Sequence, residues 1–315
     1  MKRNLGFDIA RIISMFYIIG VLHLSGYTGI SVANYDTCVS FIWSTLGVFT
    51  FLSAYLLASK YNFSSKQEII KFYTKRLLRF YPLFFISSIA LIAIKFNTWN
   101  ETWKGLLGIS PFWKPQQQTL WYIATSMFLY IITPILCTNK LIHTILRAIL
   151  ILSATFLIDI SFHSVDSRFY YYFVIYTSGI IIAKHFSTIG IRILQSRWTL
   201  TTGIPYIILL LAIYQNSNQI FMLGAGYVGI IVILNTTILF SKAIGNQKRL
   251  CKIIYFVSYG SMCAYLFHRE IYWFFLELWK PTEPTTIWAY LFFIAFPITL
   301  LISYYIQKGY DRIFN

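Results

Sequence analysis

The chain is 315 residues long, and 57% of its residues are hydrophobic while only 11% are charged. Soluble domains carry about 25% charged residues, so this composition excludes a water-soluble globular protein. The formal net charge is +16, but the lysines and arginines are scattered between hydrophobic stretches instead of lining one groove, which argues against nucleic-acid binding. The four cysteines lie far apart without a C-x-x-C pair, so neither a disulfide framework nor a metal site is predicted.

Apolar stretches of membrane-spanning length follow one another along the chain. A span needs about 20 apolar residues, and because lipid offers the backbone no hydrogen-bond partners, runs this long and apolar predict helices. We therefore predict an all-α polytopic membrane protein, with about ten transmembrane helices in one bundle and a single domain over residues 1–315. The stretches are 9–27, 39–58, 81–97, 119–137, 143–161, 169–185, 198–215, 219–240, 255–277 and 286–306.

The distribution of positive charge predicts the orientation. If the N-terminus is cytoplasmic, twenty of the 26 Lys and Arg residues fall in cytoplasmic segments and six in outer ones. Cytoplasmic segments carry the excess of Lys and Arg, so we expect both termini in the cytoplasm and a multi-pass protein of the inner or plasma membrane. The longest connections are then a basic cytoplasmic loop at 59–80 and an outer loop at 98–118 that contains Trp99, Trp103 and Trp113.

The first span carries three ionisable residues, Asp8, Arg11 and His23. Such groups are costly in lipid and usually face a bundle interior or a wet cavity. Asp8 and Arg11 are one helical turn apart, so they can pair, and His23 lies about 18 Å further along the helix axis. The alternatives are a pair that merely sits at the cytoplasmic interface and a histidine that is held between helices without a chemical role. Because charges interrupt the start of the span and no small-residue cleavage site follows, we expect a retained helix instead of a signal peptide.

A second basic cluster precedes the third span, where Arg76 and Arg79 are again one turn apart. Two guanidinium groups on one helix face could grip a phosphate. Pro82 follows, and proline is favoured in the first turn of a helix. An ordinary anchor to anionic lipid is the equally simple alternative.

Five short sequence elements lie in or beside the first four predicted spans and the ninth. They are Phe7-Asp8-Ile9-Ala10-Arg11 followed by His23, Val48-Phe49-Thr50-Phe51-Leu52-Ser53-Ala54-Tyr55-Leu56-Leu57, Arg76-Leu77-Leu78-Arg79, Leu120-Trp121-Tyr122-Ile123 with Leu129-Tyr130-Ile131 and Pro134, and Tyr265-Leu266-Phe267-His268. Together, and in this order, they resemble the integral-membrane acyltransferase family typified by the O-antigen and exopolysaccharide O-acetylases. The resemblance covers nearly the whole chain.

This resemblance implies transfer of an acyl group, commonly acetyl from cytoplasmic acetyl-CoA, to a hydroxyl of a glycan or related acceptor at the outer side. It implies that His23 is the catalytic group, supported by the first-span pair Asp8 and Arg11. It also implies that Arg76 and Arg79 contact the phosphates of the acyl-CoA, which is the donor substrate and not a bound cofactor. The chemistry suits these residues, because an alcohol is a poor nucleophile until a base takes its proton and histidine is the usual base near neutral pH.

His268 and Trp121 are candidates for the acceptor side, although an interface histidine packed among aromatic residues fits His268 equally well. The outer tryptophans at 99, 103 and 113 are candidates for an acceptor lip. A membrane transporter or flippase of a glycan or lipid-linked substrate is the alternative function, because ten helices with buried ionisable residues also suit a substrate path. Transporters often show related halves or broken spans at matching positions, and the sequence displays neither.

Two positions depart from the family pattern. The family usually has ten residues between its first-span Arg and His, whereas eleven separate Arg11 from His23. Because each residue turns an α-helix by about 100°, an unbroken helix would place these two side chains about 120° apart. We therefore predict that a π-bulge near Gly20 absorbs one residue. Ala54 stands where the family typically has Gly, so we expect the packing of the second span to differ.

Overall fold

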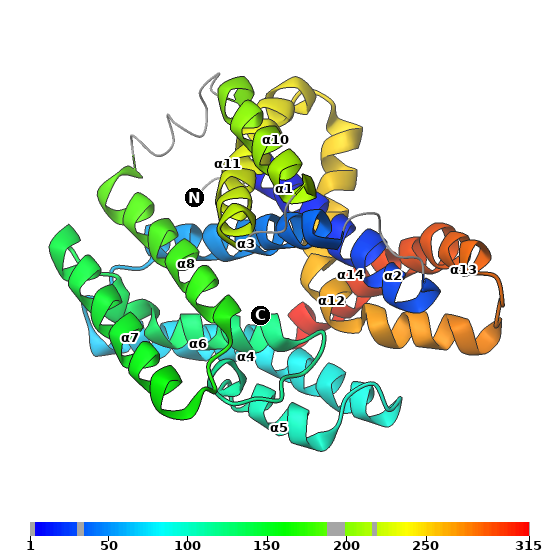
Figure 1. The fold of residues 1–315 in the computed structure, drawn as a ribbon, viewed down its shortest axis with the longest axis horizontal. Helices are drawn as coiled ribbons and strands as arrows, with labels where there is room; N and C mark the ends of the chain where they lie inside the picture. The colour runs from blue at the N-terminus through cyan, green and yellow to red at the C-terminus, as the bar shows by residue number, and fades with distance from the viewer. Residues whose placement is uncertain (1–3, 30–34, 188–198, 216–218, 315) are drawn as a thin grey trace. The chain divides into compact units, whose positions relative to one another are not determined.

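A computed structural model describes residues 4–29, 35–187, 199–215 and 219–314, and Figure 1 shows its elements in chain order. Every regular element in these residues is a helix, which confirms the all-α prediction. Seven of the described helices are long and apolar enough to cross a membrane, and two further apolar helices are shorter. The chain is therefore a multi-pass membrane protein, while the count of ten spans and the cytoplasmic termini stay predictions. The predicted start of the seventh span, residue 198, lies outside the described residues.

The chain divides into two compact units. The first comprises Met1–Phe49 and Ile191–Asn315, and the second comprises Thr50–Gly190. Helix α3 (Tyr35–Lys60) contributes its first half to one unit and its second half to the other. The single domain over 1–315 stays a prediction.

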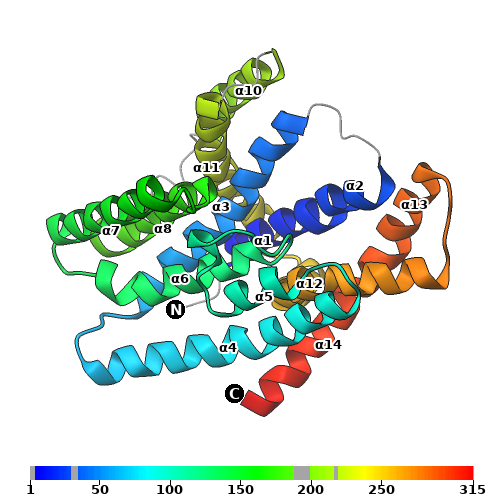
Figure 2. The same cartoon turned by 60° about the horizontal axis from the view of Figure 1, so that its bottom comes forward.

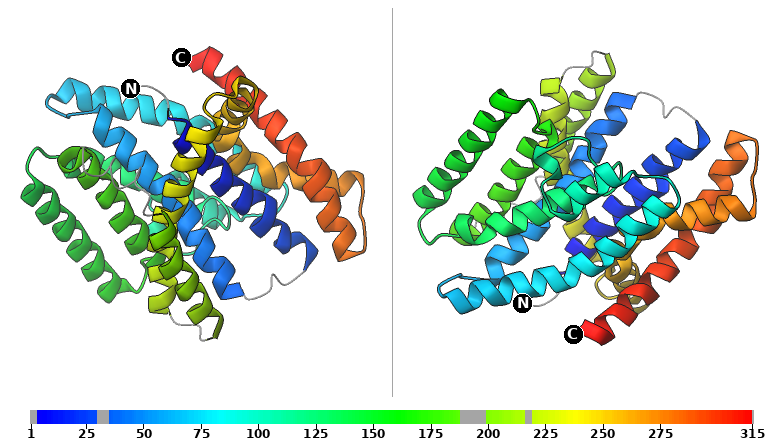
Figure 3. Two further views of the ribbon diagram at one scale, coloured as in Figure 1. Left: turned by 90° about the horizontal axis from the view of Figure 1, so that it is seen from above. Right: turned by 90° about the horizontal axis from the view of Figure 1, so that it is seen from below.

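The first unit is built around the first predicted span. This span forms α1 (Leu5–Tyr17), η1 (Ile18–Leu22) and α2 (His23–Thr28). Besides the start of α3, the other elements of the unit are α10 (Thr199–Gln215), α11 (Gln219–Ile244), α12 (Lys248–Leu278), α13 (Pro284–Tyr290), η3 (Leu291–Ala295) and α14 (Phe296–Phe314). Helix α1 begins where the Asn4 side chain accepts a hydrogen bond from the Gly6 backbone N–H, as is usual for an N-cap. It packs against α11 and α12. Helices α10 and α11 lie side by side (Figure 2), as do α12 and α14 (Figure 3).

The second unit surrounds α6 and has an aromatic core. Besides the end of α3 its elements are α4 (Lys66–Ala93), α5 (Trp99–Leu106), η2 (Ser110–Phe112), α6 (Trp121–Leu136), α7 (Leu141–Phe162) and α8 (Ser167–His185). Helix α6 contacts α4, α5, α7 and α8. Several of the largest fully buried side chains come from α4 and α8: Phe72, Phe84, Phe169, Phe173, Tyr172 and Tyr176.

The basic segment 59–80, predicted as a loop, is mostly helical. Helix α4 begins at Lys66, because the Ser65 side chain accepts a hydrogen bond from the Glu68 backbone N–H and so caps the first turn. Pro82 therefore lies inside α4 and not in its first turn, which corrects that prediction. Hydropathy identified only the apolar part of α4, from residue 81 onward. Its first turns are polar and were therefore not predicted as helix.

The segment 98–118, predicted as an outer loop, also contains helix that was not predicted. A capping box between Thr98 and Glu101 starts α5, since each side chain satisfies a backbone N–H of the other residue. A short 3-10 helix, η2, follows. This connection is therefore a folded segment and not an open loop.

Gly179 on α8 lies directly against Ala54 on α3. A Cβ atom added at Gly179 would lie 2.8 Å from the Ala54 Cβ and 2.8 Å from the Phe51 carbonyl oxygen. These distances are too short for any side chain at Gly179. The close approach of the two helices thus depends on a glycine in the neighbouring helix instead of one in the second span.

The contact between α12 and α14 depends on Gly260. A Cβ there would lie 2.9 Å from the Tyr304 backbone nitrogen, and backbone cannot move aside as a flexible side chain can. We expect Gly260→Ala to destabilise the protein by about 1–3 kcal/mol, measured by thermal denaturation in detergent. Gly309→Ala on α14 is the control, because a Cβ there meets nothing within 4 Å and alanine favours helix. Equal losses in both variants would contradict this contact.

Candidate active site

The first span is interrupted by a π-helical segment, η1, over Ile18–Leu22. The His23 backbone N–H donates to the Ile18 carbonyl, five residues back instead of four. Gly20 lies at the centre of this segment, so the predicted π-bulge is confirmed. A bulge displaces carbonyls from their usual partners, and in a membrane they must be satisfied within the protein. The Ser25 hydroxyl donates to the Leu22 carbonyl over 2.6 Å.

His23 is paired with His268. The Nδ1 atom of His23 lies 2.7 Å from the Nε2 atom of His268, and the two rings are within 10° of parallel. His268 is completely buried at 0% exposure, whereas His23 keeps partial exposure. The Nδ1 atom of His268 lies 2.9 Å from the Tyr265 carbonyl oxygen in its own helix. A partly exposed histidine residue is thus held through its ring by a second histidine that is fully buried.

Two further side chains of α12 hold the segment that carries His23. An Arg269 guanidinium nitrogen donates to the His23 carbonyl over 3.3 Å, and the same group lies 5.1 Å from the centre of the Tyr27 ring. The Tyr272 hydroxyl donates to the Ile19 carbonyl inside η1 over 3.4 Å. These contacts fix both the bulge and the start of α2.

Asp8 and Arg11 form the predicted ion pair, with 3.3 Å between Asp8 Oδ1 and an Arg11 guanidinium nitrogen. Asp8 is only 1% exposed, so its carboxylate lies in the interior of the unit and not at an open interface. The Ser258 hydroxyl donates a second hydrogen bond to Asp8 Oδ1 over 2.7 Å. Asp8 therefore links α1 to α12, and the histidine pair links α2, later in the same span, to α12.

In the second unit, Arg76 and Arg79 lie one turn apart on α4. Arg76 is half-buried, with its guanidinium carbon 5.9 Å from the centre of the Tyr130 ring. The Arg76 Nε atom is buried and has no hydrogen-bond acceptor among the described residues. Arg79 is exposed. The buried Arg76 Nε donor and the neighbouring exposed Arg79 guanidinium are groups that suit the binding of an anion.

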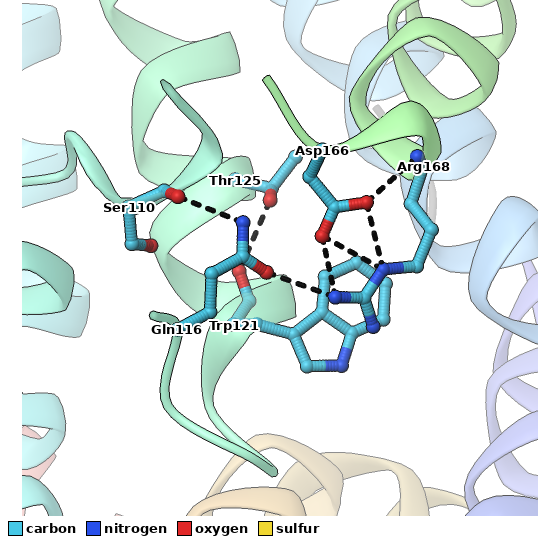
Figure 4. A network of polar contacts seen from close by, with 6 residues as sticks. All are labelled: Ser110, Gln116, Trp121, Thr125, Asp166 and Arg168. Atoms are coloured by element: carbon cyan, nitrogen blue, oxygen red, sulfur yellow. Dashed lines mark hydrogen bonds and ion pairs between the residues drawn. The ribbon is translucent and has the colours of Figure 1, made fainter. Parts of the chain in front are cut away.

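Trp121 forms one wall of a polar cluster at the start of α6 (Figure 4). The guanidinium carbon of Arg168 lies 3.8 Å from the centre of the Trp121 ring. The Arg168 Nε atom donates to both carboxylate oxygens of Asp166, over 3.0 and 2.9 Å, and another guanidinium nitrogen donates to the Gln116 side chain over 2.9 Å. Gln116 in turn donates to the Ser110 carbonyl. The cluster ties the 98–118 connection to the start of α8.

The tryptophans considered as an acceptor lip lie around this connection. Trp103 and Trp113 pack edge to face with ring centres 5.7 Å apart, and Trp99 is 60% exposed. Lys104 is buried among them and donates to the Lys114 carbonyl over 2.8 Å. Their role toward an acceptor stays a prediction. No group of three or more His, Cys, Asp or Glu side chains in the described ranges could hold a metal ion.

A family model described as an acyltransferase domain matches residues 4–308. The chain belongs to acyltransferase family 3. Membership identifies it as an enzyme that transfers acyl groups. No curated protein and no solved structure gave a significant match.

In this family 3 acyltransferase the predicted site residues fall in both units, and their roles stay predictions. The first unit brings Asp8 to Arg11 and His23 to His268, while the second holds the α4 arginines and Trp121. Sequence reasoning missed Arg269, although a charged residue inside an apolar span was signal enough to single it out. It also missed the Trp121 partner on α8, since no local pattern joins the two.

The Arg168 cluster predicts a stability effect in the second unit. Arg168→Lys keeps the charge but loses the planar fork and the stacking on Trp121, so we expect a loss of about 2 kcal/mol, measured by thermal denaturation. Lys280→Ala is the control, because Lys280 pairs with Glu277 at the surface and exposed ion pairs contribute little. An unchanged Arg168→Lys protein would show that the cluster is not structural.

Proposed function

We propose that this enzyme is an O-acyltransferase that moves an acyl group, in the first instance acetyl, from acyl-CoA to a hydroxyl of a cell-envelope glycan or related acceptor. The observation that carries the proposal is the His23 imidazole, held by the buried His268 at a bulge in a membrane span. Ionisable residues are costly inside a membrane and mark functional sites. Family membership supplies the reaction class.

His23 acts as the general base in this proposal. It takes the proton of the acceptor hydroxyl while the hydroxyl oxygen bonds to the thioester carbonyl carbon. The carbon–sulfur bond then breaks, and the proton leaves with the CoA thiolate. The Asp8–Arg11 pair supports the site by fixing the position of the helix that carries His23, since Asp8 also accepts from Ser258 on α12.

The donor phosphates bind Arg76 and Arg79. The Arg76 Nε, which is buried without an acceptor among the described residues, and the exposed Arg79 guanidinium offer the forked donors that phosphate prefers. The positive-inside count supports a cytoplasmic position for this end of α4, where acyl-CoA is available. The acceptor then binds at the outer side, with Trp121 as a contact.

The topology proposed here has ten spans and cytoplasmic termini in the inner or plasma membrane. Asp8 pairs with Ser258 and His23 pairs with His268, so the first span and α12 run in the same direction. In the proposed topology α12 is the ninth span, and all odd-numbered spans cross the membrane in the same direction as the first. A transporter or flippase becomes the weaker alternative, because family membership assigns acyl transfer.

His23→Ala should reduce acyl transfer by about 100-fold or more, which is what a general base contributes. Membranes that contain the protein are given radiolabelled acetyl-CoA, and label entering the glycan and lipid fractions is counted. His143→Ala on α7, an exposed histidine, should behave like wild type. Unchanged transfer in His23→Ala would remove His23 from the chemistry, and a wild type that transfers no label would contradict acetyl as the acyl group.

Arg76→Ala and Arg79→Ala should each raise the KM for acyl-CoA by about 10- to 100-fold, the equivalent of one charge-assisted hydrogen bond. The abundance of each variant, measured by immunoblot, should equal that of the wild type. Lys75→Ala is the matched control, because Lys75 is exposed on the same turn of α4 and is not one of the proposed phosphate contacts. If abundance falls and the KM does not change, the arginines are lipid anchors.

A further inference from the structure

The hydrogen bonds around His268 determine which nitrogen of that ring carries a proton. A peptide carbonyl can only accept, so the 2.9 Å contact between His268 Nδ1 and the Tyr265 oxygen requires a proton on Nδ1. No described carboxylate pairs with either histidine, and a buried cation without such a partner is costly. Both rings are therefore neutral, and the other nitrogen of His268, Nε2, is an acceptor.

The same reasoning then applies to His23. Its Nδ1 atom lies 2.7 Å from the His268 Nε2 atom, and two acceptors cannot share a hydrogen bond. His23 Nδ1 must therefore donate, and in a neutral ring this leaves Nε2 of His23 without a proton. The two hydrogen bonds therefore run in the same direction: His23 donates to His268, and His268 donates to a backbone carbonyl of α12.

We infer that His268 is a positioning residue that holds His23 in the Nδ1–H tautomer, so that His23 Nε2 is the nitrogen that removes the acceptor proton. The catalytic part of this inference rests on the function proposed above. The tautomer itself rests only on the contacts of the two rings. His268, buried to 0% exposure, acts on His23 and not on the acceptor.

The surroundings of His268 suit this role, because the ring is packed on several sides. The Tyr272 ring meets it edge to face, with centres 5.8 Å apart, and the Tyr265 ring lies at 6.1 Å. A ring that is held in this way cannot rotate to exchange its two nitrogens. In hydrolases a buried carboxylate orients the catalytic histidine by the same kind of contact.

Proton transfer balances without moving charge onto His268. When Nε2 of His23 takes the acceptor proton, His23 becomes an imidazolium that still donates from Nδ1 to His268. The proton returns from Nε2 to the CoA sulfur, and the starting tautomer is restored. His268 therefore keeps one proton throughout the cycle.

Substitutions of His268 by amides test the positioning role. In His268→Gln the amide oxygen can reach the place of Nε2 and still accept from His23, whereas the amide of His268→Asn reaches only the place of Nδ1. We expect His268→Gln to retain most of the activity, and His268→Asn and His268→Leu to lose about 100-fold in kcat with an unchanged KM for acyl-CoA. Equal kcat values for the Gln and Asn variants, at equal abundance, would overturn the positioning role.

A measurement without turnover tests the tautomer itself. Nitrogen-15 NMR of histidine-labelled protein in nanodiscs distinguishes a protonated ring nitrogen from an unprotonated one, and His23→Gln identifies the His23 signals by their loss. We expect a protonated Nδ1 and an unprotonated Nε2 on His23, and the reverse in His268→Leu or a mixture of both. An Nε2–H form of His23 in the wild type would overturn the inference. If His23→Ala leaves acyl transfer unchanged, the proposed function fails while this measurement still decides the tautomer.

Discussion

The hydrogen bond between His23 and His268 is the contact on which the chemistry of the first unit depends. It joins residues 245 positions apart in the chain, so the first span and α12 must be packed together before the base is correctly held. The buried contact between Asp8 and Ser258 joins the first span to α12 at a different level. Two polar contacts at separate depths fix the direction and rotation of one helix against the other, which a single apolar contact surface does not.

Interrupted helices make this arrangement possible. The first unit contains two π-helical segments, η1 and η3, and the Phe296 ring that follows η3 lies 3.5 Å from the Cβ position of Gly20 in η1. Phe16, two residues before η1, packs edge to face against the same ring. A bulge weakens a membrane helix, and side chains must satisfy the carbonyls that it displaces. Such bulges are often found at functional sites, and here η1 aims the His23 side chain at α12.

Features that depend on neighbouring residues could be predicted from the sequence. Long apolar runs gave the helices, one-turn spacing gave the first-span ion pair, and the extra residue before His23 gave the bulge at Gly20. Contacts between distant helices could not be predicted, because helix rotation depends on the packing of all side chains. His268 was therefore recognised only as a motif, and the close approach of Gly179 to Ala54 had no local signal. The early start of α4 was missed because its first turns are polar.

The central claim is that acyl transfer takes place at the His23 imidazole. The most direct measurement is a cryo-EM structure of the protein in nanodiscs with a non-hydrolysable acyl-CoA analogue. The account predicts that the acyl carbon lies within about 4 Å of the His23 ring, near the 3–3.5 Å typical of reacting atoms, with the CoA phosphates on Arg76 and Arg79. An analogue whose acyl end rests against other side chains, with His23 Nε2 bonded to the protein, would contradict it.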